Sequence, residues 1–133
     1  MNEHLTVLQT YYDLAQVFST DAAAYAAILH PEVVQTEYPN LFHKVIQHRS
    51  YTDILENIRA GRELLRDPKF EVFSTQVCPD GTIVVEGRWE ATTTNDMRDM
   101  LRGQRLSAQL CLFFEFKDGK IYRQRRYCCY DML

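Results

Sequence analysis

The sequence has no apolar run long enough to cross a bilayer, which argues against a membrane-spanning helix. The first ten residues, MNEHLTVLQT, lack the basic start and apolar stretch of a secretory signal. Basic residues are not in excess, because 15 Lys and Arg stand against 18 Asp and Glu, giving a net charge of -3. Such a charge makes nucleic acid a poor candidate partner. We therefore expect a cytoplasmic protein without membrane or nucleic-acid partners.

Cysteine is scarce, and its spacing matches no metal or redox motif. The four cysteines are Cys78, Cys111, Cys128 and Cys129, none of them in a C-x-x-C pair, and the histidines lack zinc-ligand spacing. Reduced, buried thiols are the simplest interpretation. P-loop, G-x-G-x-x-G and Ser-His-Asp arrangements are missing from any convincing context. The sequence thus predicts neither a metal site nor a cofactor.

What is present is the composition of one ordinary globular domain. The chain has 133 residues, of which 46% are apolar and 25% charged. No linker, repeat or low-complexity segment divides it. We therefore expect a single domain over residues 1–133.

The first half of the chain shows helical periodicity. Apolar residues recur at helical spacing from Leu5 to Phe18, and the alanine-rich DAAAYAAIL is expected to form a second helix that stops at His30. VVQTEYP then alternates as a short strand ending at Pro39. A capping box beginning at Ser50 predicts a third helix, which should end at Asp67-Pro68.

The second half changes to the two-residue period of strands. KFEVFSTQV and TIVVEGRWEATTT flank the turn Pro79-Asp80-Gly81 and predict one hairpin. RLSAQLCLFFEF and KIYRQRRYCCY flank Asp118-Gly119 and predict a second. Helices followed by an antiparallel meander indicate an α+β fold.

The Asp118-Gly119 turn also predicts which residues of the last hairpin face each other. The expected pairs are Phe116–Ile121, Phe114–Arg123, Leu112–Arg125, Leu110–Tyr127 and Ala108–Cys129. The apolar row on the first strand belongs on the core side, so Arg125 and Tyr127 should lie there too. Burying an unpaired guanidinium costs several kcal/mol of folding free energy. Arg125 therefore needs a carboxylate partner, for which Glu37 is our candidate. Alternatively, the arginine reaches solvent at the sheet edge.

The opposite face of that hairpin mixes polar and aromatic side chains. Such a surface suits partial coverage by a second subunit, with Phe113, Tyr122 and Tyr130 as anchors. We therefore expect a homodimer formed through the outer face of the sheet.

The order of elements, with EVVQTEYPN, GRWEATTT, FFEFKDGKI and RQRRYCCYD at the matching places, resembles the NTF2-like superfamily, and within it SnoaL-like domain proteins. The resemblance covers nearly the whole chain. It implies an NTF2-like, cystatin-like cone, in which N-terminal helices pack on a curved antiparallel sheet around an internal pocket. It also implies that the early strand lies beside the last one, near Arg125 and Tyr127, and that homodimers form through the outer face.

Two enzyme types of that superfamily can be compared with this sequence. Ketosteroid-isomerase-like members carry a carboxylate base near the end of the early strand, just before a proline. Here Tyr38 precedes Pro39, and Glu37 lies one residue earlier, so Glu37 is the tentative catalytic acid or base and Tyr38 a ligand-binding candidate. A structural ion pair is the alternative role for Glu37. Polyketide-cyclase members use an aspartate where this chain has Leu112, which departs from their pattern.

Further side chains are candidates for contact with a ligand. Tyr12 and Tyr127 could donate hydrogen bonds to a carbonyl, although buried tyrosines more often simply pack in a core. Trp89 could form a pocket wall. His43 lies in the loop after the early strand, where it could act as a proton shuttle. Arg125 is the remaining candidate for contact with a ligand.

Three functions remain open at this point. The first is a small-molecule pocket protein of SnoaL-like type, with isomerase, cyclase or hydrolase-like acid/base chemistry on an apolar or aromatic metabolite. The second is a non-catalytic binder of such a molecule. The third is an interaction module whose dimer surface is its function.

Overall fold

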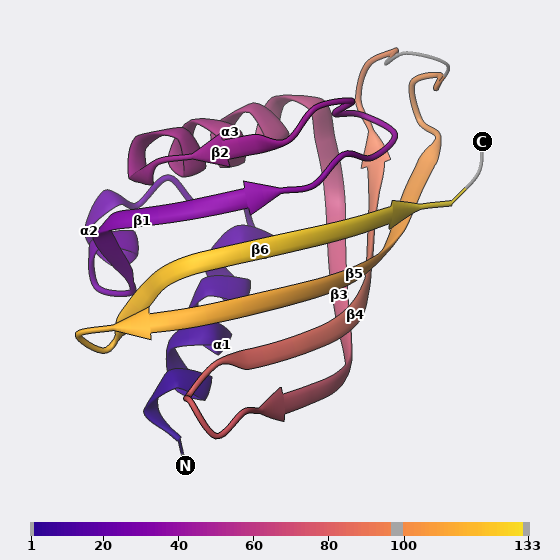
Figure 1. The fold of residues 1–133 in the computed structure, drawn as a ribbon. Helices are drawn as coiled ribbons and strands as arrows, with labels where there is room; N and C mark the ends of the chain where they lie inside the picture. The colour runs from indigo at the N-terminus through magenta and orange to yellow at the C-terminus, as the bar shows by residue number, and fades with distance from the viewer. Residues whose placement is uncertain (1, 97–99, 132–133) are drawn as a thin grey trace.

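The structure, a computed structural model, describes residues 2–96 and 100–131. Within them the chain forms an α+β fold, as predicted, with helices on one side of a single sheet (Figure 1). The elements are α1 (Glu3–Gln16), α2 (Ala22–Ala26), β1 (Leu29–Glu37), β2 (Gln47–Arg49), α3 (Tyr51–Leu64), β3 (Leu65–Val77), β4 (Ile83–Thr93), β5 (Arg105–Lys117) and β6 (Lys120–Tyr130). No helix of this described part is long and apolar enough to span a membrane.

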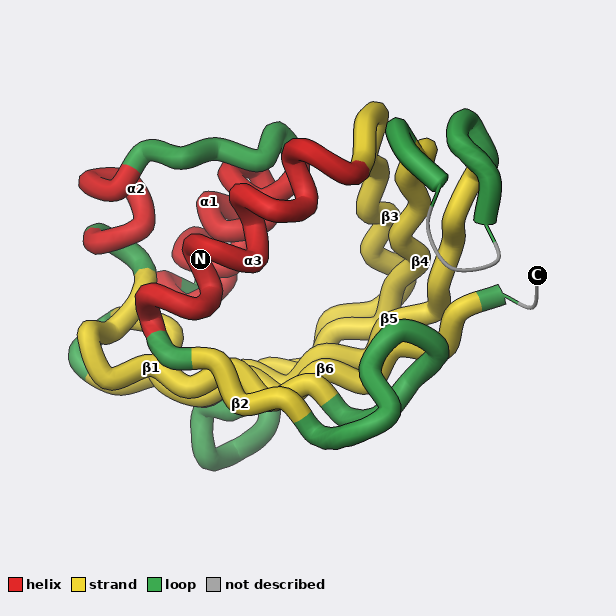
Figure 2. Tube along the Cα trace, turned by 90° about the horizontal axis from the view of Figure 1, so that it is seen from above, coloured by secondary structure: helices red, strands yellow, loops and turns green. Residues whose placement is uncertain are grey.

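The six strands follow the order β2-β1-β6-β5-β4-β3. Neighbouring strands are antiparallel, except that β1 runs parallel to β6. The expectation that the early strand lies beside the last one is therefore confirmed. Figure 2 shows the sheet curling, so that β3 and β4 rise toward the helices while β1 and β2 lie beneath them. The helices cover the concave face, and we call the other side the outer face.

The C-terminal ends of two helices were predicted several residues beyond their actual positions. The second helix ends at Ala26, and β1 already includes His30 and Pro31. The third helix keeps its predicted capping box at Ser50 but ends at Leu64, so Asp67-Pro68 lies inside β3. Both prolines fall where the strand pairing shifts register, which is where a residue without an N–H can be accommodated in a sheet.

The last hairpin has its predicted turn. Lys117 pairs with Lys120, and the two turn residues have the positive φ angles of a tight hairpin, 55° at Asp118 and 75° at Gly119. Phe116 pairs with Ile121, as predicted. The next pair is Glu115–Arg123, which leaves Tyr122 without an opposite residue. This β-bulge on β6 shifts the rest of the strand by one residue.

The predicted register was therefore wrong beyond the bulge. Leu112 lies opposite Arg126 rather than Arg125, and Leu110 lies opposite Cys128 rather than Tyr127. Because a one-residue shift moves every side chain to the other face, Arg125 and Tyr127 lie on the outer face. Residues at alternate positions of β6 take the concave face in their place: Gln124, Arg126, Cys128 and Tyr130. Tyr130 is consequently no anchor of the outer face.

The core lies between the helices and the concave face. Side chains from α1, α2, α3 and the four strands β1, β4, β5 and β6 form one cluster. Its best-buried large members are Leu8, Tyr25, Leu29, Ile54, Ile83, Phe114 and Ile121. This packing fixes α1 and α3 against the sheet and leaves room between them and the curled strands.

Candidate functional site

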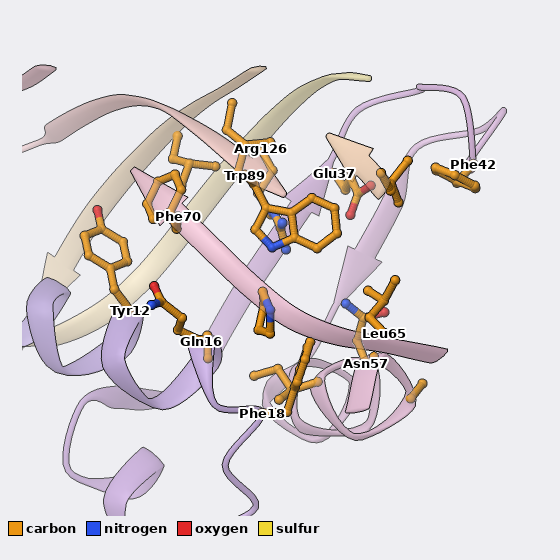
Figure 3. Close-up of a pocket in the computed structure, with 18 of the residues that line it drawn as sticks. Tyr12, Gln16, Phe18, Glu37, Phe42, Asn57, Leu65, Phe70, Trp89 and Arg126 are labelled. Carbon is orange, nitrogen blue, oxygen red and sulfur yellow. The ribbon is translucent and has the colours of Figure 1, made fainter. Parts of the chain in front are cut away.

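A cavity of about 380 Å³ lies between the helices and the concave face, and Figure 3 shows the side chains that line it. Its size is at the lower end of small-molecule pockets. Most of the wall is apolar: Ala15, Phe18, Phe42, Ile58, Leu64, Leu65, Phe70, Trp89, Leu106, Leu110 and Leu112. Polar side chains, among them Tyr12, Glu37 and Arg126, make up a smaller part of the wall. The cavity therefore suits a molecule with an apolar body and a small number of polar atoms.

Tyr12 forms one end of the cavity in Figure 3, and Trp89 lies between it and Glu37. The Tyr12 ring, carried by α1, packs edge-on against Phe70 at 5.2 Å between centroids. Its hydroxyl is buried and, among the described residues, has no hydrogen-bond partner. Burial, followed by the nearby Tyr11, raises the pKa of Tyr12, so the hydroxyl keeps its proton and remains a donor.

Glu37, the last residue of β1, lies at the other end of the cavity and is almost fully buried. Arg49 Nη1 donates to its Oε1 at 2.8 Å, and Asn40 Nδ2 donates to its Oε2 at 2.8 Å. Burial raises the pKa of Glu37, but the charge of Arg126 and the hydrogen bonds from Arg49 and Asn40 outweigh it and bring the pKa below its ordinary value of 4.5. The carboxylate is therefore ionised at neutral pH.

A chain of buried hydrogen bonds holds this ion pair in place. Arg49 Nη1 also donates to Gln35 Oε1 at 3.0 Å, and Gln35 Nε2 donates to Gln124 Oε1 at 2.7 Å. The chain follows from strand pairing, because Gln35 and Glu37 lie beside Gln124 and Arg126 on the concave face. Glu37 is thus fixed by three strands, β1, β2 and β6.

His43 approaches the same carboxylate from the loop after β1. Its Nε2 lies 3.8 Å from Glu37 Oε2, and about a third of its side chain (36%) is exposed. Asn40 Oδ1 accepts hydrogen bonds from the backbone N–H of Phe42 and His43, which shapes the loop. The imidazole therefore lines the cavity while keeping contact with solvent.

Arg126 carries the second positive charge of this end of the cavity. It lies beside Glu37 in the strand pairing and lines the cavity wall. In the described part of the chain, no carboxylate forms an ion pair with it. The Cys128 thiol lies close to it on the same face, and its Nε is buried without a hydrogen-bond partner in the part of the chain that the structure describes. The guanidinium is therefore only partly satisfied.

The structure brings together four of the seven candidate site residues. Tyr12, Glu37, His43 and Trp89 line the cavity. The other three lie on the outer side, where Arg125 pairs with Glu115 at 2.7 Å and Tyr38 stacks on the exposed Tyr127 at 4.5 Å. The pairing of Glu37 with Arg125 was therefore wrong, because the bulge turns Arg125 outward.

Sequence reasoning missed Arg126, Arg49 and Asn40. Arg126 could have been found from its alternation with Gln124 and Cys128, had the bulge been known. Arg49 comes from a three-residue strand that leaves no periodic signal. Among the described residues, no group of three or more His, Cys, Asp or Glu could hold a metal ion.

Comparison with known families and structures agrees with this architecture. The model of the SnoaL-like domain matches residues 8–124. No curated protein matches the chain. Many solved structures are similar, at identities that show the fold alone.

Three of these structures are representative. IdmH from Streptomyces antibioticus, described as a candidate polyketide cyclase, superposes with a TM-score of 0.76 at 12% identity, over 94% of this chain and 91% of its own. AclR from Streptomyces galilaeus, described as a candidate hydroxylase, gives 0.75 at 18% identity, over 96% of this chain and 79% of its own. An NTF2-like protein of unknown function from Burkholderia pseudomallei gives 0.74 at 14% identity, over 96% and 92%. The fold is therefore NTF2-like.

Proposed function

We propose, from the premise that this chain belongs to the SnoaL-like domain family, that its cavity binds a small, mainly apolar molecule and acts on it by acid/base chemistry. The observation that carries the proposal is a largely apolar cavity that ends in a charged cluster at Glu37. The names of the similar structures, which include polyketide cyclases and a hydroxylase, agree with an organic substrate. The protein would act in the cytoplasm as a homodimer.

We assign the proton transfer to His43 and a positioning role to Glu37. Both Glu37 oxygens already accept hydrogen bonds, and its low pKa makes it a weak base. His43 Nε2 lies 3.8 Å from the Glu37 carboxylate. Imidazole is a side-chain group that can exchange a proton near neutral pH. Glu37 would stabilise the imidazolium that forms when His43 takes a proton.

Proton abstraction next to a carbonyl tests this assignment. Aromatic ketones such as tetralone would be incubated with the protein in deuterated water, and loss of the α-proton signal followed by NMR. We expect faster exchange with the wild type, and loss of most of that acceleration in His43→Gln with binding retained. His48→Gln is the matched control, since His48 is exposed on β2 and contacts Thr36. Equal exchange in His43→Gln and the wild type would contradict the role of His43.

A non-catalytic binding protein is the second candidate. The observation that favours it is that Arg49 and Asn40 each donate a hydrogen bond to one oxygen of Glu37, which suits a structural role for this carboxylate. In that case ketones would bind and stabilise the protein without any acceleration of exchange. The same experiment therefore separates the two candidates.

A further inference from the structure

The charged groups at the Glu37 end of the cavity do not balance. Glu37 contributes one negative charge, and Arg49 and Arg126 contribute two positive charges. Arg49 is paired directly with the carboxylate. The positive charge of Arg126 therefore remains without an equal counter-charge in a buried setting, where such a charge is costly. Lys69 also lines the cavity, but it is exposed and screened by solvent.

The hydrogen bonding of Arg126 is incomplete as well, which also calls for a bound partner. Among the described residues, its Nε is buried without an acceptor, and the neighbouring Cys128 thiol is only a weak acceptor. Donors in protein interiors are nearly always satisfied, so a partly exposed guanidinium that lines a cavity calls for an acceptor inside that cavity. A guanidinium binds a planar carboxylate better than any neutral oxygen.

We propose that the molecule bound in this cavity is an organic monoanion whose carboxylate is held by Arg126 and whose apolar body lies against Trp89. This inference rests on the proposed function, namely that the cavity binds a small molecule. One excess charge calls for one negative charge on the ligand. A cation would be repelled, and a neutral molecule would leave Arg126 uncompensated.

Matched pairs of acids and their neutral primary amides test the inference. Suitable pairs are phenylbutyrate and phenylbutyramide, naphthylacetate and naphthylacetamide, and decanoate and decanamide, with binding measured by isothermal titration calorimetry. Trp89 is the only tryptophan of the chain and lines the cavity. A change in tryptophan fluorescence on addition of phenylbutyrate or phenylbutyramide therefore reports directly on binding there. We expect each acid that binds to do so about ten to a hundred times more tightly than its amide.

Arg126→Met removes the charge and keeps much of the volume. In this variant the acids should lose their advantage over the amides, and the unliganded protein should melt at a higher temperature, because the remaining Glu37–Arg49 pair is neutral. Arg125→Met is the matched control, since the neighbouring Arg125 pairs with Glu115 on the outer face. It should keep the wild-type preference for acids. Arg126→Lys, which keeps the charge, should retain part of the preference if Arg126→Met does not fold.

The possible outcomes are distinguishable. Amides that bind as tightly as acids to the wild type would overturn the inference and leave the proposed function standing. An acid preference that persists in Arg126→Met would overturn the assignment to Arg126. If no member of any pair binds, the proposed function fails together with the inference.

Discussion

Two arginine–glutamate pairs with opposite surroundings lie on the two faces of the sheet. Glu37–Arg49 is buried, with side chains 5% and 9% exposed, whereas Glu115–Arg125 on the outer face is 45% and 35% exposed. Removing one partner of a buried pair leaves the other charge without compensation, while an exposed pair is replaced by water. The same substitution should therefore have very different costs at the two sites.

Glu37→Gln should destabilise the protein by about 3 kcal/mol, because the buried Arg49 would lose its carboxylate while the charge of Arg126 stays beside it. Urea unfolding followed by circular dichroism measures the change. Glu115→Gln is the matched control and should cost less than about 1 kcal/mol. Similar losses in both variants would show that burial of the Glu37 pair has no energetic consequence.

The same residue gives a pH dependence with a defined sign. The folded-state pKa of Glu37 lies below its ordinary value of 4.5, so its contribution is complete above that pH and is lost as the pH falls through the lower folded-state value. The stability difference between the wild type and Glu37→Gln should therefore shrink steadily as the pH drops below about 4.5. Unfolding curves at a series of pH values test this, and a difference that stays constant on acidification would refute it.

Among the helices and strands, short sequence motifs correctly predicted the features that depend on a few neighbouring residues. The capping box at Ser50 and the Asp118-Gly119 turn are both present, because each depends on neighbouring residues alone. The bulge at Tyr122 depends on how β6 fits the curvature of the sheet, and no local pattern marks it. That one residue decides whether Arg125 or Arg126 faces the cavity, so the fold was predictable while half of the charged site was not.

The curl of β3 over the cavity depends on Gly87 in β4. A Cβ at this position would lie 2.5 Å from the Glu71 backbone oxygen and 2.7 Å from the Phe70 ring. Since backbone atoms of a paired strand cannot move aside cheaply, Gly87→Ala should separate β3 from β4 and displace Phe70 from the cavity wall.

We expect Gly87→Ala to lower the free energy of unfolding by at least about 2 kcal/mol and to weaken ligand binding. Thermal unfolding and calorimetry measure the two effects. Glu86→Ala, at the exposed neighbouring position of the same strand, should change neither. A Gly87→Ala protein with wild-type melting temperature would contradict the close packing of the two strands.

For the whole molecule, the outer face is the surface without helices. It carries Tyr127, which is 41% exposed, contacts Phe113 and stacks on Tyr38. Large exposed apolar side chains on one face are typical of interaction sites. This distribution supports the predicted homodimer through the outer face.

Tyr127→Asp should shift the protein toward monomers in sedimentation-velocity experiments at micromolar concentration, because a charge would enter the apolar contact. Val17→Asp, which changes an exposed side chain just after α1 on the helical side, should leave the dimer intact. A wild-type protein that sediments as a monomer, or a Val17→Asp variant that dissociates like Tyr127→Asp, would contradict an interface on the outer face.

The central claim is that a cavity between helices and sheet receives a small organic acid at Arg126. A crystal structure of the protein soaked with naphthylacetate tests it most directly. We predict ring density beside Trp89 and a carboxylate oxygen within hydrogen-bond distance of the Arg126 guanidinium. Density that places the ligand outside the cavity, or its carboxylate away from Arg126, would contradict binding of an organic acid at this site.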